Sequence, residues 1–96
     1  MNEDVADIAD RLAATYRAVS QDVETAQALT RKAVEQTTAT LAYAHDDGLK
    51  SGVTHLEGAA QKYGQVMDAL SDAAVTMKNH AEHIRNSRDD LDQALR

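Results

Sequence analysis

The sequence predicts an all-α fold made of two long antiparallel helices, and three observations support this prediction. Proline is absent, glycine occurs only 4 times, and the 43% of apolar residues is dominated by alanine. Alanine and the abundant Leu, Gln, Glu, Lys and Arg are strong helix formers. Apolar residues recur at steps of three and four in both halves, and one glycine-containing segment separates the halves. We therefore expect residues 1–96 to form a single helical-hairpin domain.

The second half carries the stricter apolar repeat and predicts one helix over residues 53–95. All but one of the positions at alternating steps of three and four are apolar, the exception being Arg88. These positions are Val53, Leu56, Ala60, Tyr63, Met67, Leu70, Ala74, Met77, Ala81, Ile84, Arg88, Leu91 and Leu95. A seven-residue repeat of this length is typical of a narrow coiled-coil seam.

The first half repeats the pattern less strictly and predicts a helix over residues 4–44. The apolar series consists of Val5, Ile8, Leu12, Tyr16, Val19, Val23, Ala26, Leu29, Ala33, Thr37, Leu41 and Ala44. Threonines crowd its last third, and threonine loses side-chain rotamer freedom in a helix. This stretch should be the less stable part of the first helix.

The turn is predicted over residues 45–52, where two glycines and two neighbouring aspartates fall together. Gly48 can adopt the left-handed conformation that ends a helix. Ser51 or Thr54 can cap the next helix, and Thr54 with Glu57 has the spacing of a capping box.

The hairpin should bury too little bulky apolar surface to be stable alone. Aromatic side chains are limited to 3 tyrosines, with no Phe or Trp. Dimerisation into a four-helix bundle, with itself or with a related hairpin, would cover the remaining apolar residues. These include Ala28, Val34, Val66 and Val75. Gly58 and Gly64, inside the second helix, indicate close backbone approach.

Composition argues against several partner classes. A net charge of −6 without a basic stripe disfavours nucleic acid, because phosphate binding requires clustered Lys and Arg. The first ten residues contain no apolar run typical of a secretory signal, and no stretch is long and apolar enough for a membrane span. With no cysteine, the chain suits the cytoplasm, although signal-independent export stays open.

Catalytic, cofactor and metal sites are not expected. His80 and His83 share one helix face, but no Glu-x-x-His motif of the kind found in metal-binding bundles accompanies them. Asp46-Asp47-Gly48 matches only a fragment of a calcium loop. The sequence offers no phosphate loop and no nucleophile with a neighbouring base, so we do not expect an enzyme.

Two segments resemble the WXG-type small helical-hairpin proteins of type VII secretion systems. Residues 55–70, HLEGAAQKYGQVMDAL, are similar to the start of that family's second helix, where an aromatic follows a Gln-Lys-like pair. Residues 81–95, AEHIRNSRDDLDQAL, are similar to its acidic C-terminal end. Asp46-Asp47-Gly48 stands where the family has Trp-x-Gly, and residues 84–89 lack the tyrosine of its export signal, Tyr-x-x-x-Asp/Glu.

The resemblance implies a signal-less partner or targeting helper for a larger secreted protein, or a secreted substrate itself, acting without a cofactor. Such a protein would lay its apolar seam against another helical hairpin in the cytoplasm, with export by the type VII route as an option. The residues expected to bind the partner are Leu12, Tyr16, Val19, Leu56, Tyr63, Leu70, Met77 and Ile84.

Two other functions fit the same composition. An acidic antitoxin or immunity-type protein could mask a basic toxin surface with its negative face. A purely structural coiled-coil subunit would also require the strict repeat of the second helix. Affinity that collapses in high salt would indicate charge masking rather than an apolar bundle partner.

Overall fold

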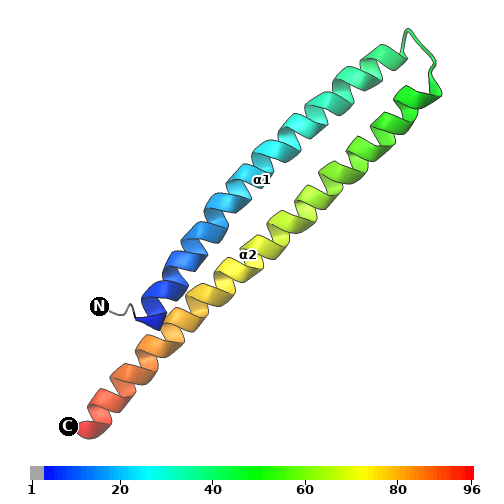
Figure 1. Cartoon of the computed structure of the whole chain (residues 1–96). Coiled ribbons are helices and arrows are strands. Elements are labelled where there is room, and N and C mark those ends of the chain that lie inside the picture. The colour runs from blue at the N-terminus through cyan, green and yellow to red at the C-terminus, as the bar shows by residue number, and fades with distance from the viewer. Residues whose placement is uncertain (1–3) are drawn as a thin grey trace. The chain divides into compact units, whose positions relative to one another are not determined.

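The computed structural model describes residues 4–96, which form two α-helices joined by a short turn (Figure 1). Helix α1 spans Val5–Leu41 and contains 37 residues, whereas α2 spans Asp47–Leu95 and contains 49. The predicted all-α helical hairpin is therefore confirmed. Its contacts divide the chain into two units, which we describe separately.

We call residues 1–19 and 69–96 the terminal unit, and residues 20–68 the turn unit. Each unit pairs a segment of α1 with a segment of α2. In the terminal unit, ion pairs join Asp10 to Arg85 and Asp4 to Arg88, so rising numbers on α1 meet falling numbers on α2. The turn unit contains the reversal of the chain between the helices. The helix segments are thus antiparallel within each unit.

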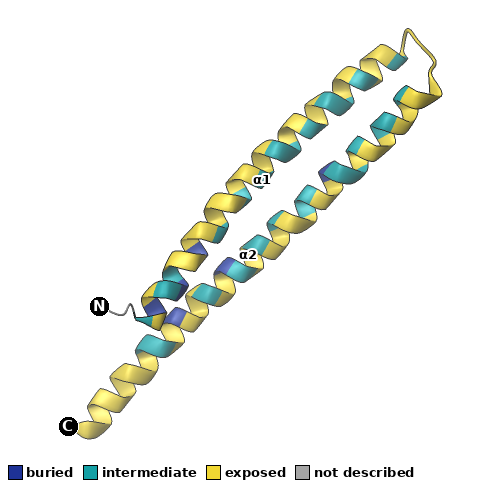
Figure 2. Ribbon diagram, viewed as in Figure 1, coloured by how far each residue is buried: buried dark blue, intermediate teal, exposed yellow. Residues whose placement is uncertain are grey.

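The apolar repeat predicted for α2 matches its burial pattern as far as Ile84. Every seam position from Val53 to Ile84 is buried or partly buried, and Ala60, Ala74 and Ala81 are almost completely so. Figure 2 shows buried and partly buried colours recurring along α2 until its exposed C-terminal turns. The seam of α2 is consequently the surface that packs against α1 within each unit.

The seam of α1 agrees only in part with the predicted series. Seven of the predicted residues are partly buried, namely Ile8, Tyr16, Val23, Ala26, Ala33, Thr37 and Leu41. An unbroken seven-residue repeat of buried or partly buried positions consists of Ala6, Ala9, Ala13, Tyr16, Ser20, Val23, Gln27, Thr30, Val34, Thr37 and Leu41. Bulkier residues that were expected there are exposed instead, namely Val5, Leu12, Val19 and Leu29. The expected series had combined two neighbouring stripes of the helix. Small side chains form much of the seam because they allow the helices to approach closely.

The turn is shorter and begins earlier than predicted. Helix α1 ends at Leu41, not near residue 44, and α2 begins at Asp47, so residues 42–46 connect the helices. Three backbone hydrogen bonds close the end of α1, the last from Ala44 N–H to the Thr40 carbonyl at 3.1 Å. Tyr43 consequently lies outside both helices and is 93% exposed.

Asp46, rather than Ser51 or Thr54, caps α2. The Leu49 N–H donates to Asp46 Oδ1 at 3.0 Å, which satisfies one of the free donors of the first turn. Ser51 and Thr54 both lie inside the helix. Gly48 also lies inside α2 and does not have a positive φ, so it does not end a helix. A Cβ at Gly48 would stand 2.9 Å from Asp46 Oδ1, so the glycine leaves room for the cap.

Candidate protein interface

Acidic residues of α1 and basic residues of α2 form a cluster of ion pairs in the terminal unit. Asp10 Oδ2 accepts from Arg85 Nη1 at 2.7 Å, and Asp7 Oδ1 accepts from Arg85 Nη2 at 2.9 Å. The Lys78 ammonium lies 3.6 Å from the other oxygen of Asp10. Because Asp10, Lys78 and Arg85 each follow a seam residue by one position, these contacts mark one edge of the paired helices. We call this the charged edge.

Asp4 has two roles at the start of α1. Its Oδ1 accepts a hydrogen bond from the Ala6 N–H at 3.0 Å, which caps the helix, and both of its oxygens accept from the Arg88 guanidinium. The hydrogen bonds from Arg88 are the main reason that the pKa of Asp4 falls to about 2, and the Ala6 N–H adds to the shift. The carboxylate is therefore held in its charged form well into acid.

The hydrogen bond from Arg85 likewise lowers the pKa of Asp10, with a smaller contribution from Lys78. Half-exposed ion pairs of this kind contribute little to stability, because water competes for the charges. They join residues near the start of α1 to residues 78–88 of α2.

The opposite edge of the paired helices carries no Lys, Arg, Asp or Glu. It consists of the residues that precede alternate seam positions. In the terminal unit these are Val5, Leu12, Val19, Ala73, His80 and Ser87. On both helices, the charged edge contains residues that stand one position after a seam residue. The residues that stand one position before a seam residue therefore lie on the other edge. We call this the uncharged edge.

In the terminal unit, α1 buries its seam alanines, whereas Val5, Leu12 and Val19 are exposed and Ile8 is partly buried. Ala6 and Ala13 are 0% and 1% exposed, whereas the preceding Val5 and Leu12 are 56% and 36% exposed. A helix that completed its packing within the hairpin would be expected to bury the larger side chains, since each buried Val or Leu contributes about 1.5–3 kcal/mol. The exposed aliphatic row is a surface suited to a further helix.

The turn unit holds its helices together by a different contact. The Gln27 side chain, in the seam of α1, donates from Nε2 to the backbone carbonyl of Ala60 in α2 at 2.8 Å. Gly64 lies beside this contact, and a Cβ there would stand 3.4 Å from Gln27 Nε2. This neighbour is a side-chain atom at ordinary contact distance, so the predicted close approach of the two backbones is not seen at Gly64. A Cβ at Gly58 would meet no neighbour within 4 Å, so the same prediction was wrong there.

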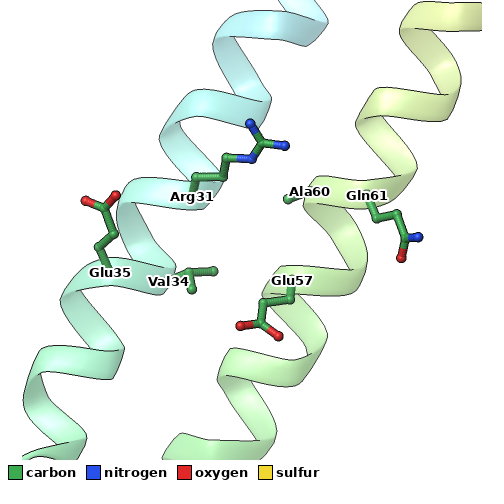
Figure 3. Close-up of a pocket in the computed structure, with 6 residues that line it drawn as sticks. All are labelled: Arg31, Val34, Glu35, Glu57, Ala60 and Gln61. Atoms are coloured by element: carbon green, nitrogen blue, oxygen red, sulfur yellow. The ribbon is translucent and has the colours of Figure 1, made fainter.

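A cavity of about 410 Å³ opens beside this hydrogen bond (Figure 3). Its lining consists of Arg31, Val34, Glu35, Glu57, Ala60 and Gln61. Figure 3 shows Val34 and Ala60 facing one another across the space between the two helices, with charged side chains around them. Val34 and Ala60 give the cavity an apolar floor, and none of the six lining residues provides a hydroxyl, thiol or imidazole.

Most of the residues predicted to bind a partner lie in the seam. Those with partly buried side chains are Tyr16, Leu56, Tyr63, Leu70, Met77 and Ile84. Met77 and Ile84 pack against the buried alanines of the terminal unit, around Ala81. Leu12 and Val19 are exposed on the uncharged edge. The structure thus places only these two of the eight predicted residues on a free surface.

Sequence reasoning placed Val5 in the seam and so missed it as a member of the exposed row with Leu12 and Val19. The signal was present, because residues 5, 12 and 19 form their own seven-residue repeat one position before the alanine repeat at 6 and 13. Val66, expected to need a partner, is 45% exposed in the turn unit.

Two further properties of residues 4–96 concern membranes and metal ions. Neither helix formed by residues 4–96 is apolar enough over a sufficient length to cross a membrane. Within the same residues, no three His, Cys, Asp or Glu side chains are grouped as a metal ion would require. Comparison of the chain with protein families, curated proteins and solved structures finds no match.

Proposed function

We propose that this chain is a non-enzymatic partner protein that completes a four-helix bundle with another helical hairpin. The observation that carries the proposal is the uncharged edge, where Val5, Leu12 and Val19 remain exposed beside an alanine seam. Helices pack by inserting apolar side chains between those of a neighbour, and this row offers such side chains at helical spacing. The occupant is a second copy of the chain or a related hairpin.

The thin core supports the same function. The fully or nearly buried residues of the described chain are all alanines, and no large side chain is completely buried. Alanine contributes little apolar area, so an isolated hairpin gains little free energy from folding. Packing on a partner would supply the missing burial. Folding and association are therefore coupled in this proposal.

The arrangement is compatible with the resemblance to WXG-type hairpins. In this role the chain would act as the signal-less member of a pair, hiding the apolar face of a larger secreted protein until it reaches a type VII secretion system. The charged edge does not support an acidic neutraliser, because Asp4, Asp7 and Asp10 are engaged by basic residues of the same chain and are less able to mask a basic toxin.

Affinity capture from host lysate, followed by mass spectrometry, tests the function. The bait is the full chain, compared with Leu12→Asp and with the matched control Ala18→Asp. Both variants add one negative charge, but Ala18 is an exposed residue of α1 outside the seam and both edges. We expect the wild type and Ala18→Asp to retain the same helical hairpin protein, or untagged copies of the chain, and Leu12→Asp to lose it.

Retention of the same partner by Leu12→Asp would contradict the proposed interface. Capture that persists for all three baits at low salt and disappears for all three at high salt would instead support charge masking. Folding of each bait is checked beforehand by circular dichroism, so that loss of capture reports the interface.

A further inference from the structure

The last two turns of α2 form an unpartnered continuation of the seam, separate from the uncharged edge. We call residues 89–95 the α2 extension. The seam positions after Ile84 are Arg88, Leu91 and Leu95, which continue the same steps of three and four. Leu91 and Leu95 are nevertheless 60% and 77% exposed. Figure 2 shows this end of α2 as exposed on all sides of the ribbon.

The loss of burial coincides with the start of α1. Asp4, which caps α1, pairs with Arg88, and Val5 is the first helical residue. All residues beyond Arg88 are exposed in the structure of residues 4–96. The α2 extension therefore repeats the pattern of a packed helix without being covered by any residue of the described chain.

Charge indicates what kind of surface would cover it. The extension carries Asp89, Asp90 and Asp92, and none of the ion pairs among residues 4–96 involves them. Carboxylates near the C-terminal end of a helix are opposed by the helix dipole, and α2 has no basic residue in its last turn to compensate. A basic partner would remove this unfavourable interaction while covering the leucines.

We propose that the α2 extension docks an amphipathic helix of another protein whose apolar stripe is flanked by Lys and Arg. The apolar stripe covers Leu91 and Leu95, and the basic flanks face Asp89, Asp90 and Asp92. A second copy of the chain is a poorer occupant, because it would bring a second set of the same aspartates to the contact. The docked helix packs against the seam of α2 beyond the part that pairs with α1 and Asp4.

Fluorescence anisotropy with two synthetic helical peptides tests this proposal on the full chain. Both peptides carry leucine at the seam positions, with lysine at the flanking positions of one and glutamate at those of the other. We expect the lysine peptide to bind at least about tenfold more tightly than the glutamate peptide. The double variant Leu91→Ala/Leu95→Ala should weaken its binding by about tenfold or more, because only the complex buries these leucines.

Leu29→Ala is the matched control. Leu29 is 64% exposed on α1, belongs to the turn unit and is far from the α2 extension in sequence. This variant should bind the lysine peptide as the wild type does. Asp89→Asn/Asp90→Asn/Asp92→Asn should weaken binding and flatten its salt dependence. Leu12→Asp should leave peptide binding unchanged, so failure here is distinguishable from failure of the proposed bundle interface.

Three results would overturn the proposal. Equal affinity for the two peptides would show that the α2 extension does not select a basic partner. Equal binding of the lysine peptide by the wild type and by Leu91→Ala/Leu95→Ala would show charge attraction without docking. A self-association of the wild type that Leu91→Ala/Leu95→Ala abolishes would make a second copy the occupant.

Discussion

The terminal unit and the turn unit use the same seven-residue repeat but hold their helices together differently. The terminal unit has a seam of buried alanines, with Ala6, Ala9 and Ala81 in mutual contact, and a row of ion pairs along one edge. The turn unit has one almost fully buried alanine, Ala60, a hydrogen bond from Gln27 across the seam and an open cavity of about 410 Å³. The first is closely packed, and the second retains unfilled space.

This difference shows that the same seven-residue repeat can specify which helix faces pair without specifying how densely those faces pack. Alanine allows close approach in the terminal unit, and the ion pairs join the two helices along one edge. In the turn unit, the seam residues Thr30 and Thr37 bond their hydroxyls to carbonyls of their own helix at 2.8 Å. These hydroxyls need no partner from α2. Register there depends on Gln27, because its carbonyl partner occupies one position on α2.

The largest expected effect contrasts the packing of the two units. Ala81→Leu should lower the free energy of unfolding by about 1–3 kcal/mol, because Ala81 is completely buried and the added carbons have no space. Ala60→Leu should cost clearly less, since Ala60 lines the cavity and the leucine can extend into it. Urea denaturation followed by circular dichroism measures both. An equal or larger loss for Ala60→Leu would contradict the difference in packing.

The cap of α2 gives the next effect. Asp46→Ala should destabilise the chain by about 1 kcal/mol, because it removes the acceptor for the Leu49 N–H. Asp46→Asn should retain most of the stability, as asparagine is an equally good cap. Asp47→Ala is the control, since the Leu49 N–H donates to Asp46 and not to Asp47. The cap assignment fails if Asp47→Ala destabilises the chain as much as Asp46→Ala does.

A smaller effect is expected at the polar contact of the turn unit. Gln27→Ala should lower the free energy of unfolding by about 0.5 kcal/mol, the lower end for one hydrogen bond. The Ala60 carbonyl lies inside α2 and keeps its helical partner, so no buried group is left unsatisfied. Gln65→Ala, at an exposed position of α2, serves as the control and should be neutral. A decrease in the free energy of unfolding several times larger than this would mean that Gln27 also contributes to packing, in addition to this hydrogen bond.

The smallest effect is a pH dependence confined to the terminal unit. The pKa of Asp4 is lowered to about 2, and that of Asp10 is also lowered. A lowered pKa in the folded state gives stability above the unfolded pKa, and this stability is lost as pH falls from about 4 through about 2. We therefore expect the Tm to decrease over this range.

Asp4→Asn separates the ion pair from the cap, because asparagine can still accept from the Ala6 N–H but carries no charge. Its Tm should fall less than that of the wild type between about pH 4 and about pH 2. Thermal melts followed by circular dichroism make the comparison. Identical pH profiles for the two proteins would show that Arg88 does not stabilise the Asp4 carboxylate.

The fold and the seam of α2 could be predicted from the sequence, because that seam combines large apolar residues with a strict repeat. The seam of α1 could not be predicted by hydrophobicity, since it contains Ala6, Ser20, Gln27 and Thr37 while larger residues lie outside it. Choosing the most apolar stripe therefore selected Leu12 and Val19, which are exposed.

The turn was misplaced for a similar reason. Glycines suggested a break at residues 48–52, but a helix can include glycine at modest cost when a cap precedes it. Asp46 provides that cap, and the choice among Asp46, Ser51 and Thr54 depends on backbone conformation rather than residue type. The ion pairs of the terminal unit were equally hidden, because they join residues separated by 78 and 84 positions.

Sedimentation velocity tests the central claim, that the uncharged edge packs against another hairpin, most directly. The wild type, Leu12→Asp and Ala18→Asp are compared, each alone and mixed with the captured partner, at low and high salt. We predict a complex of two hairpins for the wild type and Ala18→Asp that persists in high salt, and a monomer for Leu12→Asp. A wild type that stays monomeric under every condition, or a Leu12→Asp variant that associates as the wild type does, would contradict the claim.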